Sequence, residues 1–185
     1  MKLTVVTSNP GKAAEFGEAL GKLGIETVHE KIEYDEVQSD SLEDVVRKGM
    51  EELRSKGISD FIIDDTGLFI DSLKGFPGVW SAYVQKTIGN PGILKLMEDS
   101  EDRGAEFRTC IGCDIKGETI IVTGVCRGEI TERPRGTDGF GYDPIFTADG
   151  KRTFAELGLS EKNGISHRGN AVRSLIGEIE KRRLL

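Results

Sequence analysis

The sequence predicts an α/β fold, and three patterns of apolar residues support this prediction. Residues 3–6 and 61–63 are short apolar runs typical of buried strands. Residues 107–127 alternate with a period of two around a short polar turn, as in a β-hairpin. Apolar residues with helical spacing follow the first strand, fill residues 42–53 and recur near the C-terminus. We therefore expect residues 1–185 to form a single domain, with room for a smaller lobe.

The composition limits the classes of partner. The 185 residues carry a formal net charge of −7, so a broad surface for nucleic acid or anionic membrane is not expected. No apolar run approaches the roughly 20 residues of a membrane span. The opening Met1-Lys2 and the short apolar run after it do not make a signal peptide, so we expect a cytoplasmic location. An acidic protein that binds polyphosphate must gather basic groups locally or recruit a divalent cation.

The first strand, Leu3–Val6, leads directly into the segment Thr7–Phe16. Asn9 is a favourable N-cap and Pro10 fits the first helical position, so a helix is expected to begin there. Such a turn directs backbone N–H groups, the positive helix end and the Lys12 ammonium into one volume that attracts phosphate. An ordinary strand-to-helix junction explains the spacing about equally well. The segment is neither a P-loop nor a dinucleotide-binding fingerprint, because it lacks both glycine patterns.

The next segments pair a second strand with a second helix. Residues 25–32 are expected to form the strand, and the acidic residues 33–40 follow as either a solvated loop or the source of a carboxylate for magnesium. Ser41 is expected to cap a strongly amphipathic helix, in which Lys48 lies off the apolar face and points to solvent or to a cleft wall. That apolar face consists of Leu42, Val45, Val46, Met50 and Leu53.

Two adjacent acids follow the buried strand 61–63. We expect Asp64, Asp65 and Thr66 to lie at the C-terminal end of this strand, where open α/β sheets bind ligands. Two neighbouring carboxylates repel each other, and a cation beside them relieves the repulsion. The alternative is that one of them caps the following turn. The acids are therefore candidate ligands for a metal ion.

A glycine-rich segment, Gly136–Pro144, carries Phe140 and Tyr142. Its glycines permit sharp turns and close approach of the backbone to a ligand, and exposed aromatic side chains there can stack on a base. A plain surface turn is the alternative, but it would place the two aromatic residues oddly.

A polar segment, residues 160–169, is expected to form a loop before a C-terminal helix at residues 171–183. It gathers Lys162, His167 and Arg168 within a short stretch. The last two could be a helix-entry pair, but a shared anion or a base carbonyl explains both donors better.

The remaining segments are expected to be structural. Residues 68–73 continue as a strand or a short extended piece, and Trp80 packs in the core or against the smaller lobe. Asn90 opens a helix over residues 93–98, and residues 153–159 form a short helix.

The cysteines are not expected to bind metal. Cys110 and Cys113 form a CxxC pair, but their odd spacing on a strand points them to opposite faces. With Cys126 they are expected to be reduced thiols, because no second pair or histidine completes a zinc site.

Taken together, separated segments resemble one family, the inosine triphosphate pyrophosphatases, also called XTP/dITP pyrophosphatases. The matching segments are TSNxxKxxEF at Thr7–Phe16, DDTGL at Asp64–Leu68, GFPGVWSA at Gly75–Ala82, GFGYDP at Gly139–Pro144 and K-x4-HR at Lys162–Arg168. The resemblance implies an α/β fold with a mixed twisted sheet flanked by helices, in two lobes around a central cleft. It also implies a homodimer and a magnesium cofactor.

The implied activity is hydrolysis of ITP, dITP and XTP to the monophosphate and pyrophosphate, which keeps non-standard purines out of DNA and RNA. The resemblance places magnesium at Glu36 and Asp65, with Asp65 also as general base, although Glu33 or Asp35 could replace Glu36. It places the triphosphate and the base at a larger set: Thr7, Ser8, Asn9, Pro10, Gly11, Lys12, Lys48, Thr66, Phe140, Gly141, Tyr142, Asp143, Lys162, His167 and Arg168.

In this hypothesis Phe140 stacks on the purine, and His167 and Arg168 donate to its 6-oxo group. Two other functions remain open. A Maf-like nucleotide pyrophosphatase would run a similar reaction on other bases, but the TSN opening and the HR pair argue against it. A nucleotide-sensing module would bind without turnover, and the paired acids argue against that.

Overall fold

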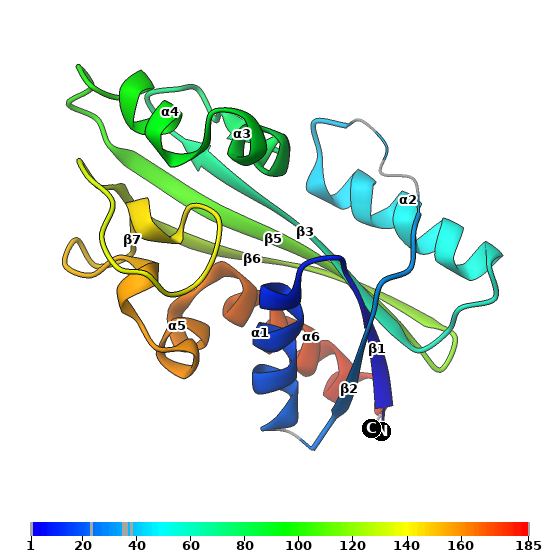
Figure 1. Cartoon of the computed structure of the whole chain (residues 1–185). Helices are drawn as coiled ribbons and strands as arrows, with labels where there is room; N and C mark the ends of the chain where they lie inside the picture. The colour runs from blue at the N-terminus through cyan, green and yellow to red at the C-terminus, as the bar shows by residue number, and fades with distance from the viewer. Residues whose placement is uncertain (1, 23, 35–36, 38, 185) are drawn as a thin grey trace.

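The structure is a computed structural model that describes residues 2–22, 24–34, 37 and 39–184. Within these residues, seven strands form one mixed sheet with the order β2-β1-β3-β5-β6-β7, and β4 pairs with the outer part of β3 (Figure 1). β1 runs parallel to both of its neighbours, while every other pairing is antiparallel. The strands are β1 (Lys2–Val6), β2 (Glu26–Glu30), β3 (Phe61–Ile70), β4 (Pro77–Gly78), β5 (Gly104–Ile115), β6 (Glu118–Ile130) and β7 (Phe146–Thr147).

Helices cover both faces of this sheet, as the resemblance implied. The α-helices are α1 (Pro10–Gly21), α2 (Leu42–Ser55), α3 (Ser81–Thr87), α4 (Gly89–Leu96), α5 (Leu159–Ile165) and α6 (His167–Lys181). Two short 3₁₀ turns are η1 (Asp143–Ile145) and η2 (Phe154–Glu156). Among the described residues, none of these helices combines the length and the apolar character needed to cross a bilayer.

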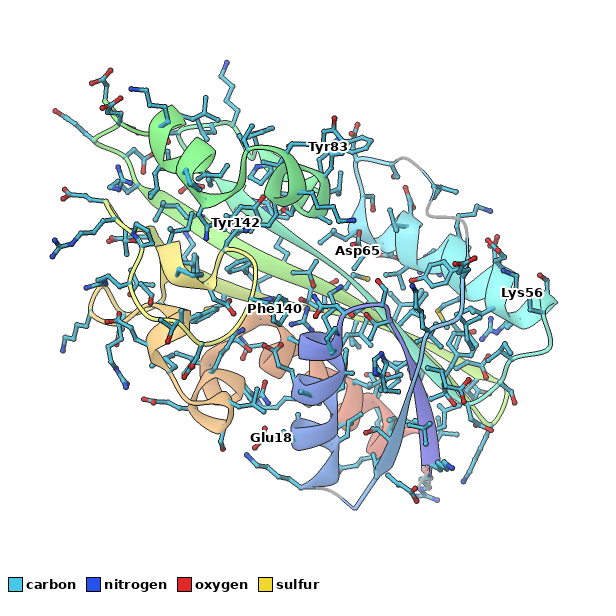
Figure 2. All side chains as sticks on the ribbon, in the orientation of Figure 1. Glu18, Lys56, Asp65, Tyr83, Phe140 and Tyr142 are labelled. Carbon is cyan, nitrogen blue, oxygen red and sulfur yellow. The ribbon has the colours of Figure 1, made fainter. Side chains whose placement is uncertain are left out.

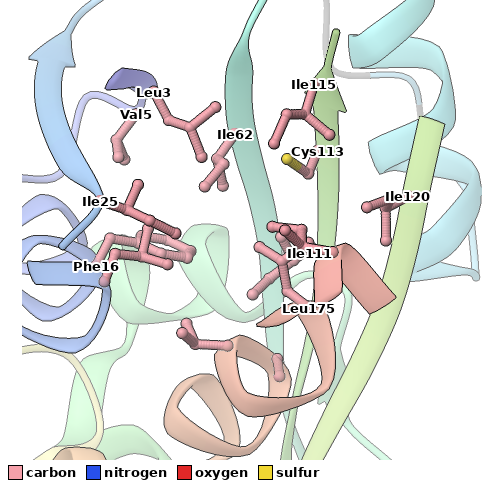
Figure 3. Close-up of a cluster of buried hydrophobic side chains, with 14 residues drawn as sticks. Leu3, Val5, Phe16, Ile25, Ile62, Ile111, Cys113, Ile115, Ile120 and Leu175 are labelled. Atoms are coloured by element: carbon pink, nitrogen blue, oxygen red, sulfur yellow. The ribbon is translucent and has the colours of Figure 1, made fainter. Parts of the chain in front are cut away.

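Hydrophobic clusters on opposite faces of the sheet hold α1 and α6 to one side and α2 to the other. Ile62 packs with Phe16 of α1 and Leu175 of α6 (Figure 3), whereas the next residue, Ile63, packs with Met50 of α2. Neighbouring residues of a strand point to opposite faces, so β3 serves both layers. A further cluster joins the outer halves of β3, β5 and β6 to α3 and α4.

The predicted start of α1 is confirmed. The Asn9 side-chain oxygen accepts hydrogen bonds from the backbone N–H groups of Gly11 (2.8 Å) and Lys12 (3.3 Å), and Pro10 is the first helical residue. Ser41 likewise caps α2 by accepting from the N–H of Asp44. These caps satisfy donors that have no partner within the helix.

The predicted hairpin is also confirmed, with longer strands than expected. β5 and β6 pair along their whole lengths, and the connecting residues Lys116 and Gly117 have φ angles of 51° and 82°. Two consecutive positive φ angles are typical of a type I′ turn, whose twist matches that of the strands it joins. This long hairpin forms the central part of the sheet, and the other elements pack on it.

The prediction that Asp64 and Asp65 end a short strand is wrong. β3 is one continuous strand, because β5 pairs with it from Phe61 to Ile70. β1, by contrast, pairs only with Phe61 and Ile62. The two acids therefore lie in the middle of β3, at the point where its parallel neighbour has ended.

Several local predictions also need correction. The polar segment 160–169 is not a loop: α5 ends at Ile165, and Ser166 caps α6 by accepting from the N–H of Gly169. The short helix predicted over residues 153–159 is instead the 3₁₀ turn η2 (Phe154–Glu156), and Leu159 is already the first residue of α5. The helix α3 was not predicted, and α4 begins at Gly89, so Asn90 lies inside it and is not its cap.

The three cysteines are buried and free, as predicted for reduced thiols. Cys110 packs in the cluster under α2, and Cys113 packs in the cluster under α1 and α6, so the two lie on opposite faces. Burial raises the pKa of Cys110 to about 11 and that of Cys113 to about 12. Such thiols remain protonated and unreactive near neutral pH.

Candidate active site

A cleft of about 1200 Å³ lies where β1 ends beside the middle of β3. The β1–α1 turn, β3, α3, the loop before η1 and the first residues of α6 all contribute to its wall. Most of the predicted site residues line it: Thr7, Ser8, Asn9, Pro10, Lys12, Asp65, Thr66, Phe140, Gly141, Tyr142, Asp143, Lys162, His167 and Arg168. The structure thus brings segments from both ends of the chain into one cavity.

Three predicted residues are not among the described residues that line this cleft. Gly11 lies in the first turn of α1, between Pro10 and Lys12, which both line it. Lys48 lies on the exposed side of α2, where its ammonium pairs with Glu51 at 2.7 Å, and it is not among the lining residues that the structure describes. Glu36 and its alternative Asp35 lie outside the described residues. The other alternative, Glu33, does line the cleft.

The predicted phosphate-binding turn opens the N-terminus of α1 toward the cleft. Thr7 Oγ1 accepts a hydrogen bond from the N–H of Asn9 at 3.1 Å, which fixes the turn ahead of the helix cap. Lys12 Nζ lies 3.1 Å from Asp64 Oδ2 and remains partly exposed. A helix N-terminus beside a lysine favours anions, so this end of the cleft suits a phosphate group.

Beneath the cleft lies a buried charge network of three acids and three bases: Lys12, Glu15, Asp64, Asp143, Lys162 and Arg168. Lys162 Nζ bridges Glu15 and Asp143 at 2.6 Å to each. Arg168 bridges Glu15 and Asp64, with its Nη2 atom 2.9 Å from Asp64 Oδ2. The formal charges cancel, which makes the burial of so many ionised groups tolerable.

Sequence reasoning missed the part that Glu15 plays in this network. Glu15 is almost fully buried on α1, as is the next residue, Phe16. Its spacing of three residues from Lys12 puts both side chains on one helix face. An acid one helical turn after a predicted phosphate lysine was the available signal.

The electrostatics of the network fix the charge of Asp64 and Arg168. Burial favours the neutral form of Asp64, but Lys12 and Arg168 outweigh it and hold the pKa of this carboxyl below its usual value. Burial also opposes the charge on Arg168, yet Asp64 and Glu15 raise the pKa of its guanidinium above the usual range. Asp64 therefore acts as an internal anion that orients Lys12 and Arg168.

The two adjacent acids on β3 point to opposite sides of the strand. Asp64 points into the charge network, whereas Asp65 lies on the side of β3 that faces α2 and remains partly exposed in the cleft (Figure 2). The N–H of Thr66 donates to Asp65 Oδ1 at 2.9 Å. Thr66 Oγ1 bonds to Asp64 Oδ2 and accepts from Arg168.

His167 is a buried and neutral imidazole at the cleft wall. Its ring stacks on Phe107 with centroids 4.5 Å apart, and Nδ1 has no hydrogen-bond partner among the residues that the structure describes. Burial, followed by the charges of Arg168, Lys162 and Lys12, holds the pKa of His167 well below its usual range. A neutral ring with an unsatisfied nitrogen can donate to or accept from a ligand, depending on its tautomer.

The aromatic loop, residues 136–144, presents one of its two rings to the cleft and buries the other. Phe140 is partly exposed and lies beside the N-terminal end of α1 (Figure 2), with Lys162 Nζ 4.8 Å from its ring centre. Tyr142 is buried, and its hydroxyl donates to the carbonyl oxygen of Ser81 at 2.8 Å. The expectation of two exposed aromatic residues is therefore wrong for Tyr142.

The cleft also contains residues that the sequence did not single out. Trp80 was expected in the core, but it is 43% exposed and lines the opening with Tyr83. Lys31 and Lys56 line the opposite side, and Lys56 Nζ is held by Glu52 at 2.6 Å. No sequence motif marks Tyr83, Lys31 or Lys56, and Trp80 falls at a variable position of the GFPGVWSA segment. The lining combines residues near α3, after β2 and at the end of α2, which are distant in the sequence.

The fit of the cleft to a divalent metal rests on Asp65. Among the described residues, no three histidine, cysteine or acidic side chains gather closely enough to hold a metal by themselves. Magnesium needs no such cage, since it commonly binds through one or two carboxylates and completes its shell with water and phosphate oxygens. A partly exposed carboxylate in the same cleft as a phosphate-binding turn is compatible with that mode.

Residues 3–178 match the family model described as the Ham1 family. The dITP/XTP pyrophosphatase of Pyrococcus horikoshii is 53% identical over 175 residues, which cover 94% of each chain, and that of Thermococcus kodakarensis is 49% identical with the same coverage. A solved Ham1 protein from Coxiella burnetii is 33% identical and superposes with a TM-score of 0.80, covering 98% of this chain and 99% of its own. The Staphylococcus aureus Ham1 protein is 27% identical, with a TM-score of 0.81 and coverage of 98% and 100%. The family model, the relatives and the solved structures all match nearly the whole chain. The chain therefore belongs to the Ham1 family.

Proposed function

We propose that this protein is a nucleoside triphosphate pyrophosphatase that hydrolyses non-standard purine nucleoside triphosphates, such as ITP, dITP and XTP, to the monophosphate and pyrophosphate. Relatives named dITP/XTP pyrophosphatases span nearly the whole chain. The observation that carries the proposal is a single cleft lined by a helix N-terminus with Lys12, by the Asp65 carboxylate and by the neutral ring of His167. These groups suit a triphosphate, a hydrolytic water and a purine, respectively.

The triphosphate binds at the N-terminus of α1. Backbone N–H groups of the turn and the Lys12 ammonium donate to its oxygens and balance its negative charge. Asp64 holds the lysine in place, since the ammonium lies 3.1 Å from this carboxylate and also donates to the Asp64 carbonyl oxygen. The same contacts stabilise the charge that develops on the leaving pyrophosphate.

Magnesium fits the proposed site at Asp65, with Glu36 as the expected second carboxylate and Glu33 as its alternative. When bound, the ion supplies positive charge that neutralises the triphosphate beside an acidic protein. Asp65 is also placed to accept a proton from the attacking water, because its carboxylate is accessible from the cleft. The water oxygen forms a bond to the α-phosphorus, and the bond to the bridging oxygen of pyrophosphate breaks.

The purine binds between the aromatic loop and the first turn of α6. Phe140 provides a ring face for stacking. His167 with its proton on Nδ1 donates to the 6-oxo group of hypoxanthine or xanthine, which gives a partner to an atom that has none among the described residues. Adenine would place a donor against this donor, and an unpaired buried donor costs about 1–3 kcal/mol. Lys162 and Arg168 act mainly by supporting this wall, since both are engaged in the charge network.

The products of hydrolysis test the proposal. Incubation with ITP and magnesium is expected to release pyrophosphate and inosine monophosphate, measured by ion-exchange chromatography of the nucleotides and a pyrophosphate assay. Release of orthophosphate and diphosphate would show attack at the γ-phosphorus and refute the assignment. Binding of ITP without any turnover would indicate the sensing module instead.

A pair of matched variants tests the role of Asp65. Asp65→Asn is expected to abolish hydrolysis while ITP still binds, measured by calorimetry. Asp71→Asn is the control, because Asp71 lies just beyond the end of β3 in a surface ion pair with Arg127 and away from the cleft. Full activity of Asp65→Asn would remove this carboxylate from the chemistry.

The homodimer expected from the family resemblance stays a prediction. Light scattering coupled to size-exclusion chromatography should give twice the chain mass of 20.2 kDa. A mass of one chain at micromolar concentration would contradict it.

A further inference from the structure

We propose that Gly11 is a positioning residue that sets where the Phe140 ring stands, and so couples the phosphate-binding end of the cleft to its base-binding end. The inference rests on the proposed function, in which Phe140 stacks on the purine. It assigns to Gly11 a steric role that is separate from any hydrogen bond its N–H makes to phosphate.

The first observation is the close approach of Phe140 to Gly11. A methyl group added at Gly11 would lie 2.7 Å from Phe140 Cε1 and closer still to Cδ1. Carbon atoms in favourable contact stand roughly 3.5–4.0 Å apart, so the ring would have to retreat by about 1 Å. The absence of a side chain at residue 11 therefore makes room for this ring against the first turn of α1.

The second observation is that the backbone behind the ring is held in place. The N–H of Phe140 donates to Asp143 Oδ2 at 2.8 Å, and that carboxylate is bonded to Lys162. The carbonyl oxygen of the next residue, Gly141, accepts from the side-chain amides of Gln85 (3.2 Å) and Asn90 (3.0 Å). The loop is thus tied both to the charge network and to the helices α3 and α4.

A side chain at residue 11 would therefore displace the ring more than the loop. The backbone of residue 11 is held as firmly, because its N–H donates to the capping oxygen of Asn9 at 2.8 Å. Gly11 has a helical conformation, so alanine is compatible with its backbone and improves the helix propensity of α1. The added methyl group would also lie 3.1 Å from the capping oxygen Asn9 Oδ1, so a Phe140→Ala background is needed to separate an effect on the ring from an effect on the cap.

A double-mutant cycle tests the inference. The variants are Gly11→Ala, Phe140→Ala and the combination of both, assayed for kcat and KM with ITP and magnesium. Gly21→Ala is the matched control on the same helix, since a methyl group there meets none of the described residues within 4 Å. We expect Gly11→Ala to raise KM about tenfold with a smaller change in kcat, because a misplaced ring weakens binding of the base. In the Phe140→Ala background the same substitution should change KM by less than about twofold.

Equal losses from Gly11→Ala in both backgrounds would overturn the inference, and so would a Gly11→Ala variant with unchanged KM. If Gly11→Ala folds poorly, thermal unfolding decides the question: recovery of stability in the double variant supports the steric contact, and no recovery refutes it. Failure of the proposed function can be distinguished from failure of this inference, because the unmodified protein would then release no pyrophosphate from ITP.

Discussion

Replacement of Glu15 by glutamine tests the buried charge network most directly. Glu15 binds both Lys162 and Arg168, and the side chains of all three are at most 3% exposed. The network holds three acids and three bases, so Glu15→Gln leaves one positive charge without a counter-charge in the interior. Glutamine also keeps only one acceptor oxygen, and its NH₂ group then faces a cationic donor.

The expected destabilisation follows from this geometry. Removal of one partner of a buried ion pair destabilises a protein by about 3–5 kcal/mol, because the remaining charge stays buried without compensation. For a chain of this length each kcal/mol lowers the melting temperature by about 2–4 °C, so a decrease of about 6–20 °C is expected.

Glu43→Gln is the matched control. Glu43 pairs with Arg47 on the surface of α2, where both side chains are about half exposed. Such pairs contribute roughly 0.3–0.5 kcal/mol. Urea unfolding followed by circular dichroism, with thermal melts in parallel, gives the free energy of unfolding of both variants. If Glu15→Gln lies within about 1 kcal/mol of the unmodified protein, the cost of burying Glu15 offsets its attraction to the two cations, and our reasoning fails.

Three other predictions follow from the same contacts. Because the pKa of His167 is well below its usual range, the folded protein keeps this ring neutral while the unfolded chain binds a proton below about pH 6.5. The free energy of unfolding should therefore fall as the pH drops through that value. Urea unfolding at pH 7.5 and 5.5 should show a smaller fall for His167→Gln than for the unmodified protein. An equal fall in both proteins would contradict this. Burial raises the pKa of both Cys110 and Cys126 to about 11, so these thiols should not react with Ellman's reagent at pH 8 until the protein is unfolded. Labelling of the native protein would show that they are accessible. Lys12→Met should raise KM for ITP by at least tenfold, since a charge-assisted hydrogen bond is worth about 1.5–3 kcal/mol. Lys22→Met, at the exposed end of the same helix, should leave KM within twofold, and equal effects of the two would refute the assignment of Lys12.

The sequence by itself determined those elements that depend on residues close together in the chain. The cap at Asn9, the proline after it, the apolar face of α2 and the turn at Lys116-Gly117 each depend on residues within one or two turns of chain. It also indicated the site, because the segments that carry the chemistry keep recognisable patterns at Thr7–Lys12, at the acids of β3 and at the start of α6.

Only the tertiary structure decided how these groups divide their roles. Asp64 and Asp65 are neighbours in sequence, but the alternation of a strand sends one into the charge network and leaves the other in the cleft. The sequence predicted Lys162 and Arg168 to be donors in a polar loop. In the structure, α5 and α6 bury both of them against Glu15, which lies about 150 positions away along the chain. Such pairings depend on how distant elements pack, and no local pattern encodes them. The same is true of Phe140, whose place in the cleft is set by a glycine on a helix at the other end of the chain.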